Sequence, residues 1–151
     1  MSSKCIENNT KTKKWWLDSE FLFHREDGPA VIRLDGHEEW WPHGLCHREN
    51  GPAVIHTDGA KEWWIRGMRH RENGPAIEHV SGHKEWFLFG SRHRIDGPAV
   101  EWASGTKEWW YYGMRHRIDG PAIILANGSQ EWWVGGKLIE ENDVNWSLEG
   151  F

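Results

Sequence analysis

Cysteine is scarce in this chain, which has only Cys5 and Cys46 among its 151 residues. Two thiols provide neither a disulfide framework nor a four-ligand zinc site. Long apolar runs are missing too, so neither a signal peptide nor a membrane span is predicted. These absences predict a reducing, cytoplasmic location, which would be the host cytoplasm if the source is viral.

An excess of positive charge is also missing. The formal net charge is -5, with 23 acidic against 18 basic residues. Binding to duplex nucleic acid requires a basic footprint, because most of its affinity comes from phosphate neutralisation. Duplex nucleic acid is therefore excluded as the expected partner.

Tryptophan, in contrast, is abundant: the chain has 13, and most fall at fixed places in a tandem repeat. The repeat is 23 residues long and occurs five times without slippage, over residues 24–46, 47–69, 70–92, 93–115 and 116–138. A strict short period indicates a stack of identical supersecondary units, not a globule with one central site.

Each copy contains a Gly-terminated turn dipeptide between two short β-prone runs. The five dipeptides are Asp35-Gly36, Asp58-Gly59, Ser81-Gly82, Ser104-Gly105 and Asn127-Gly128. Such dipeptides predict two-residue hairpin turns. We therefore predict an all-β fold, in which five 23-residue β-hairpins form one elongated, continuous, twisted antiparallel sheet.

The segments outside the repeats are interpreted by their composition. Residues 1–14 are polar and lysine-bearing, which predicts a disordered tail. Residues 15–23 imitate part of a repeat and are expected to form an N-terminal half-repeat cap. Residues 139–151 are acidic with scattered apolar side chains and are expected to cap the other end, protecting the last strand edge.

A two-residue turn fixes the cross-strand pairs and hence the two faces of the sheet. In the first copy Val31 is expected opposite Trp40, the first of the paired tryptophans, on the core face. The second face is expected to carry Ala30, Glu39 and Trp41 and to meet solvent or a partner.

A histidine opens every copy: His24, His47, His70, His93 and His116. Successive copies in such a sheet lie roughly 10 Å apart, whereas zinc ligands lie ~2.0–2.1 Å from one ion. Column neighbours therefore cannot share a metal, and a loop histidine hydrogen-bonded to the backbone is expected. No catalytic residues, cofactor or metal site is predicted, because no nucleophile elbow or phosphate-cradling glycine loop recurs.

Arginines bracket the histidine in the central copies and form the first group of predicted binding residues: Arg69, Arg71, Arg92, Arg94, Arg115 and Arg117. In extended chain both guanidinium groups project from one side, which favours bidentate contacts to phosphate or carboxylate. The alternative for Arg71, Arg94 and Arg117 is a structural ladder with the glutamates that precede the Trp pairs. Arg69, Arg92 and Arg115 are favoured as ligand contacts, because Cys46 and Leu138 replace them in the terminal copies.

The second aromatic of each copy forms the other group of predicted binding residues: Trp41, Trp64, Phe87, Trp110 and Trp133. These rings are suited to stack on sugars, bases or the apolar side chains of a partner. The alternative is that they pack against the loops of the next copy.

The run from Glu62 to His70, followed by the Ser81-Gly82 turn, resembles the MORN repeat. Trp64, Gly67 and His70 match that family's Trp, Gly and His, and the match recurs in all five copies over residues 24–138. The chain resembles a divergent branch of the sort met in bacteria, phages and large viruses. The resemblance implies a single-layer elongated sheet and a binding or scaffolding role without a common catalytic residue.

The resulting functional hypothesis is a non-enzymatic binding protein that engages a protein partner through its repeat surface, as an inhibitor or adaptor. If the source is a phage, the resemblance favours an anti-defence inhibitor. One alternative is a sponge that sequesters a small nucleotide or glycan between the aromatic and Arg columns. Another is a structural unit that forms homo-oligomers through sheet edges or termini.

Overall fold

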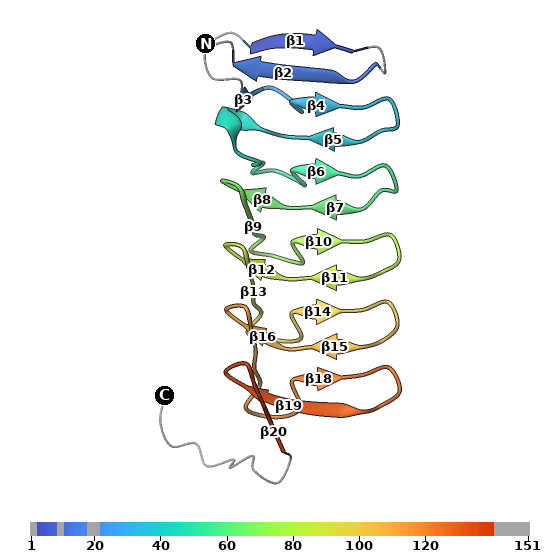
Figure 1. The fold of residues 1–151 in the computed structure, drawn as a ribbon, viewed down its shortest axis with the longest axis vertical. Coiled ribbons are helices and arrows are strands. Elements are labelled where there is room, and N and C mark those ends of the chain that lie inside the picture. Colours follow the sequence, from blue (N-terminus) through green and yellow to red (C-terminus); the bar gives the residue numbers. More distant parts are fainter. Residues whose placement is uncertain (1–2, 9–10, 18–21, 141–151) are drawn as a thin grey trace.

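The computed structural model describes residues 3–8, 11–17 and 22–140 and shows an elongated stack of antiparallel hairpins (Figure 1). Fourteen strands form one sheet, in which β4, β5, β6, β7, β10, β11, β14, β15, β18 and β19 follow one another as neighbours. The predicted all-β fold with one large antiparallel sheet is confirmed. Within the described ranges, no helix is long and apolar enough to cross a membrane.

Each of the last four repeats makes two hairpins rather than one, and the first repeat makes one. The first hairpin of a repeat, which we call the sheet hairpin, belongs to the large sheet. The five sheet hairpins are β4–β5 (Val31–Ile32, Glu38–Glu39), β6–β7 (Val54–Ile55, Lys61–Glu62), β10–β11 (Ile77–Glu78, Lys84–Glu85), β14–β15 (Val100–Glu101, Lys107–Glu108) and β18–β19 (Ile123–Ile124, Gln130–Val134).

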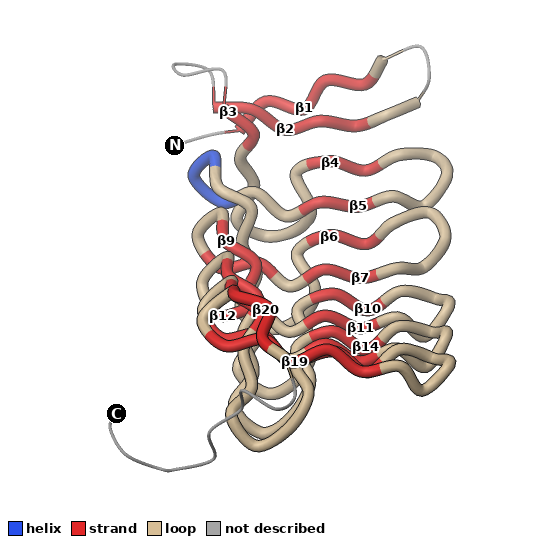
Figure 2. The backbone as a smooth tube through the Cα atoms, turned by 60° about the horizontal axis from the view of Figure 1, so that its bottom comes forward, coloured by secondary structure: helices blue, strands red, loops and turns tan. Residues whose placement is uncertain are grey.

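The second, which we call the side hairpin, follows directly along the chain. The four side hairpins are β8–β9 (Trp64–Ile65, Met68–Arg69), β12–β13 (Phe87–Leu88, Ser91–Arg92), β16–β17 (Trp110–Tyr111, Met114–Arg115) and the end of β19 with β20 (Lys137–Ile139). In the first repeat a 3-10 turn, η1 (Pro42–Gly44), takes this place. The side hairpins gather as a second column beside the sheet hairpins (Figure 2).

The sheet-hairpin turn has three residues, not the predicted two. In the second repeat the N–H of Gly59 donates to the carbonyl of His56, and the N–H of His56 donates to the carbonyl of Ala60. Only Gly59 of this loop has a positive φ, of 88°. This is a type I turn closed by a left-handed glycine, the usual geometry of three-residue hairpin loops.

The longer loop shifts the register by one residue, so the predicted faces are wrong. Val31 pairs with Glu39 instead of Trp40, and Val54 pairs with Glu62. A one-residue shift moves every side chain of the returning strand to the other face. The column of glutamates therefore shares a face with the valines, whereas the first tryptophan shares the opposite face with Ala30.

Both faces contribute to the core. The alanine of each Gly-Pro-Ala sequence is fully buried in all five repeats, at 0% exposure: Ala30, Ala53, Ala76, Ala99 and Ala122. The next residue is buried too, with Val100 at 1%.

The prediction of a disordered tail over residues 1–14 is also wrong for part of that segment. Residues 3–7, within the segment expected to be a disordered tail, form β1 (Ser3–Glu7). This strand pairs with β2 (Lys13–Leu17), which in turn pairs with β3 (Leu22–Phe23) and with β4. The predicted cap over residues 139–151 lies outside the described residues, except for Ile139 and Glu140.

Candidate functional site

The arginine that follows each loop histidine folds over its own loop. Arg71 lies with its guanidinium carbon 3.9 Å from the centre of the Trp63 ring, and it donates to the carbonyl of Pro75 at 3.1 Å and to Glu78 at 2.6 Å. The same stacking recurs at four other sites: Arg25 on Trp15, Arg48 on Trp40, Arg94 on Trp86 and Arg117 on Trp109. Arg71, Arg94 and Arg117 therefore cover the first Trp column and are not paired with the glutamate column.

The loop glycine makes room for this arginine. A Cβ built on Gly74 would lie 3.1 Å from the guanidinium carbon of Arg71, and one on Gly120 would lie 2.9 Å from that of Arg117. The recurring His-Arg-x-Asp/Asn-Gly-Pro-Ala sequence is thus a packing unit. Its Arg covers the preceding repeat, its Gly admits the Arg, and its Ala enters the core.

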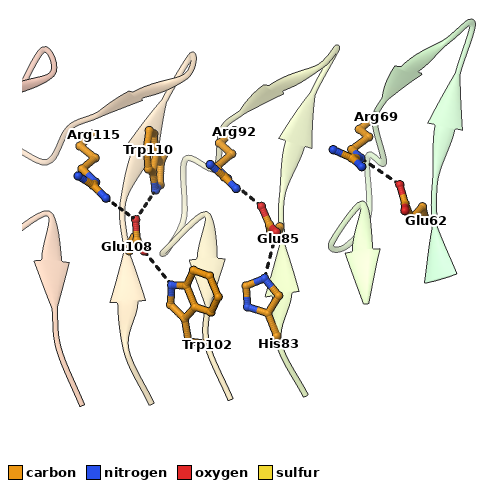
Figure 3. Close-up of polar contacts among 9 residues, drawn as sticks. All are labelled: Glu62, Arg69, His83, Glu85, Arg92, Trp102, Glu108, Trp110 and Arg115. Carbon is orange, nitrogen blue, oxygen red and sulfur yellow. Dashed lines mark hydrogen bonds and ion pairs between the residues drawn. The ribbon is translucent and has the colours of Figure 1, made fainter. Parts of the chain in front are cut away.

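In the three central repeats, the glutamate before the two aromatic residues accepts several hydrogen bonds (Figure 3). Glu62 accepts from His56 at 2.8 Å, from the Trp64 indole at 3.0 Å and from Arg69 at 3.0 Å. Glu85 accepts from Arg92 at 2.7 Å. Glu108 accepts from Trp102, Trp110 and Arg115.

These contacts keep Glu62 and Glu85 charged. Burial alone would raise the pKa of Glu62, but hydrogen bonds from His56, Arg69 and Trp64 outweigh it and lower the pKa below its ordinary value. The pKa of Glu85 is lowered in the same way, with His83 and Arg92 as partners. A buried carboxylate that is stabilised in its charged form suits a structural ion pair better than an acid catalyst.

The second aromatics and second arginines alternate along the stack. Arg69 lies 4.9 Å from the Trp64 ring centre and 5.7 Å from that of Phe87. Arg92 continues the series between Phe87 and Trp110, and Arg115 lies between Trp110 and Trp133. We call this series, from Trp64 to Trp133, the Arg–aromatic ladder.

The ladder accounts for most of the predicted binding residues. Arg69, Arg92 and Arg115, expected to be free ligand contacts, each hydrogen-bond to a glutamate within the fold. The rings of Trp41, Trp64, Phe87, Trp110 and Trp133 are all half-buried. The structure thus brings the two predicted groups together, but as packing partners of one another.

The loop histidines hydrogen-bond to the backbone, as predicted. Nδ1 of each accepts the N–H of a residue 19 positions later; the five donors are His43, Arg66, Phe89, Tyr112 and Gly135. Four of these donors are non-glycine residues with positive φ, between 44° and 51°. Such a conformation is strained for most side chains, so the histidine stabilises the side-hairpin tip of its own repeat, or the 3-10 turn in the first repeat.

Exposed aromatic and Met side chains gather on the side hairpins, at positions for which no binding role was predicted. Met68, Phe89, Tyr111, Tyr112 and Met114 are between 40% and 56% exposed, and we call them the tip surface. A groove of about 610 Å³ lies next to it, lined by Trp86, Leu88, Phe89 and Ile95 and by the Arg71 and Arg94 loops. The sequence signal for these hairpins is the x-Gly dipeptide at residues 66–67, 89–90 and 112–113. Both residues of each dipeptide have a positive φ, as a tight hairpin turn requires.

Comparison with known proteins gives no family: neither a family model nor a curated protein matches this chain.

Proposed function

We propose that this chain is a non-enzymatic binding protein that engages a protein partner through the tip surface, as an inhibitor or adaptor. The observation that carries the proposal is the gathering of exposed aromatic and Met side chains on successive side hairpins. Exposed apolar clusters of this kind mark interaction sites, and Tyr, Phe and Met are enriched in the centres of protein interfaces.

The geometry of the side hairpins supports a protein partner over a small anionic ligand. Phe89 stacks on His70 with ring centres 4.2 Å apart, and Tyr112 lies 4.3 Å from His93. Rings held in place lose little side-chain entropy on binding, which favours affinity. The side hairpins repeat along one side of the stack (Figure 1), so the tip surface extends over several repeats, as suits a macromolecule.

The arrangement of the arginines argues against the nucleotide or glycan sponge. Arg94 covers the Trp86 ring, with its guanidinium carbon 4.1 Å from the ring centre, so a base or sugar would have to displace it to stack there. Arg94 also donates to Asp96 and Glu101, which satisfies its charge within the fold. Ligand phosphates would therefore compete with existing ion pairs.

The MORN-like resemblance belongs to the same proposal. Tandem antiparallel β-hairpins fit a repeat scaffold of that kind, and such scaffolds present extended surfaces to partners. The analogy adds support for binding over catalysis, whereas the partner's identity rests on experiment.

A capture experiment with two matched variants tests the proposal. Phe89→Asn with Tyr112→Asn removes two tip rings while keeping residues that tolerate positive φ. Leu34→Asn with Val80→Asn is the control, because these side chains are 75% and 68% exposed but lie in sheet-hairpin turns. The tip variant should lose the proteins that wild type captures from native lysate, and the control should keep them. Equal capture by both variants would refute the tip surface as the binding site.

A further inference from the structure

A cluster of two histidines and one glutamate lies on the central sheet hairpin, β10–β11. His79 and His83 stand opposite each other across the turn, where the N–H of His79 donates to the carbonyl of His83 at 2.9 Å. Glu85 is two residues beyond His83 and so projects from the same face. One ligand atom from each of the three residues lies within 4.8 Å of the other two.

His83 has a ring nitrogen without a partner. Its Nε2 is 3.0 Å from Glu85 Oε1, but its Nδ1 is buried and has no hydrogen-bond partner among the described residues. The side chains of His83 and Glu85 are only 9% and 10% exposed. An ion shared with Glu85 takes Nε2, the nitrogen that faces that carboxylate, and the ring proton then lies on Nδ1.

The surroundings orient the cluster. The His83 ring stacks on Trp102 with centres 4.2 Å apart, which fixes the plane of the ring (Figure 3). Arg92 Nε holds Glu85 Oε2 at 2.7 Å, so the other carboxylate oxygen faces His83. Hydrogen bonds of this kind, made to the ligands of a metal, fix ligand orientation in metal sites.

We propose that His79, His83 and Glu85 bind a divalent transition-metal ion, with Zn²⁺ as the ion that suits this ligand set. Zinc takes imidazole nitrogen and carboxylate oxygen at ~2.0–2.2 Å, and two histidines with one glutamate are an established three-ligand set. Ligand atoms around one tetrahedral ion of this kind lie about 3.4 Å apart, so the three atoms, now within 4.8 Å of one another, must approach by at most about 1.4 Å, which the exposed side chain of His79 permits. The fourth position, on the exposed His79 side, is open to water or to a ligand atom of a partner.

The cluster occurs in the third repeat alone, which supplies controls within the same chain. The second repeat has His56, Ala60 and Glu62 at the equivalent positions, and the fourth has Trp102, Thr106 and Glu108. The sequence argument against metal binding compared histidines of the same column, roughly 10 Å apart. His79 and His83 belong to different columns and face each other within one hairpin.

Titration of the chelator-treated full chain with Zn²⁺ at pH 7.5, followed by calorimetry, tests the assignment. Wild type should bind one ion, and His79→Ala should weaken binding at least tenfold without unfolding, because the His79 side chain is exposed. His56→Ala should bind as wild type does. Ala60→His should raise the stoichiometry to two, because it completes the same ligand set in the second repeat.

Three outcomes would overturn the assignment. The first is a wild type that binds no Zn²⁺, and the second is a His79→Ala variant that binds with unchanged affinity. The third is loss of binding in His43→Ala, because His43 belongs to the other His/Glu cluster of the described residues, formed with His24 and Glu26. Co²⁺ provides a second readout: wild type should give a four-coordinate absorption spectrum that His79→Ala lacks.

Discussion

The first repeat and the three central repeats share their sheet hairpins but differ beside them. The central repeats place an arginine between successive aromatics, whereas the first repeat has Cys46 at that position. Cys46 is 4% exposed and packs with Ala53, Val54 and the rings of Trp40, Trp41 and Trp64. The same position thus holds an ion-paired guanidinium in the central repeats and, in the first repeat, a buried thiol packed against apolar side chains.

The difference separates what the sheet requires from what the central repeats add. Glu39 in the first repeat is satisfied by His37 at 2.6 Å and Trp41 at 2.7 Å. Its central counterparts gain an arginine as well, and the Arg–aromatic ladder starts with them. The sheet hairpin and its Arg-covered tryptophan therefore form the basic unit, and the ladder reinforces the middle of the stack.

Removing a first-column tryptophan should have the largest effect, and the effect should depend on position. Trp86→Ala is expected to lower the free energy of unfolding by about 3 kcal/mol, since it removes a large packed ring. Trp132→Ala should cost clearly less, because Glu140 stands where the covering arginine would be and no described guanidinium lies over Trp132. Urea titrations of both variants measure the difference. Equal losses would show that the covering arginine adds nothing.

Changing the glutamate before the two aromatic residues should have the next largest effect. Glu85→Gln is expected to cost about 2 kcal/mol, because it leaves Arg92 without its carboxylate partner. Glu131→Gln should cost less than about 1 kcal/mol, because Trp133 at 2.8 Å is the one partner recorded for that carboxylate within the described chain. Chemical denaturation tests both, and the reverse order of losses would contradict the role assigned to the Glu85 contacts.

Exchanging the arginine and the cysteine between the central and first repeats should change the free energy of unfolding by a smaller amount. Arg92→Cys is expected to cost about 1.5 kcal/mol, because it breaks the ion pair with Glu85 and two cation–π contacts. Cys46→Arg should change stability by less than about 1 kcal/mol, since Glu39 offers a carboxylate to the new guanidinium. Thermal melts of the two variants measure the exchange. A severe loss in Cys46→Arg would mean that the first repeat cannot extend the ladder.

Acidification should weaken the central repeats in two stages. Burial lowers the pKa of His93 below its ordinary value of 6.5, so the folded state binds this proton less readily than the unfolded state. The His93 contribution is therefore complete above pH 6.5 and is lost as the pH falls below it. The contributions of Glu62 and Glu85, whose pKa values are lowered from 4.5, are complete above that pH and are lost below it.

Urea titrations between pH 8 and pH 3 measure both stages. His93→Asn should flatten the upper stage, because it removes the titrating ring, and leave the lower stage in place. An unchanged upper stage in this variant would show that other groups produce it.

The smallest effect concerns thiol chemistry. Burial, with Glu39 and Glu62 nearby, raises the pKa of the Cys46 thiol to about 12, whereas Cys5 is exposed. The thiolate is the reactive form, so the native chain should expose one reactive thiol to a disulfide reagent and the unfolded chain two. Cys5→Ser should abolish the native reaction with no change in melting. A reactive Cys46 would show that the apolar core of the first repeat opens readily.

The period and the glycine-terminated turns were sufficient to predict the fold. Repetition makes every copy bury the same positions, so the 23-residue spacing identifies the stack without knowledge of any contact. The backbone role of the loop histidines also followed from spacing. These features depend on local chemistry that is identical in each copy.

Register and pairing could not be obtained in the same way. Asp58-Gly59 is compatible with a two-residue and a three-residue loop, and the choice decides on which face Glu62 lies. The tip glycine Gly67 follows an arginine, and an Arg-Gly pair is a weak turn signal although it makes the two-residue turn. The partners of Arg69 and Arg71 depend on that register. The sequence therefore offered Arg71 as a partner of the glutamate column, whereas in the structure Arg69 pairs with Glu62 and Arg71 stacks on Trp63.

The hydrogen bond from each tip-glycine N–H to the carbonyl of a residue 21 positions earlier, in the preceding repeat, makes every repeat depend on its predecessor in the same way. Such uniform seams make whole repeats interchangeable, so copy number becomes a variable that gene duplication can adjust. Deleting residues 70–92 would join Arg69 to His93 and recreate each seam, shortening the array by roughly 10 Å. Reach along a partner can therefore be changed in fixed increments, without redesign of any single residue.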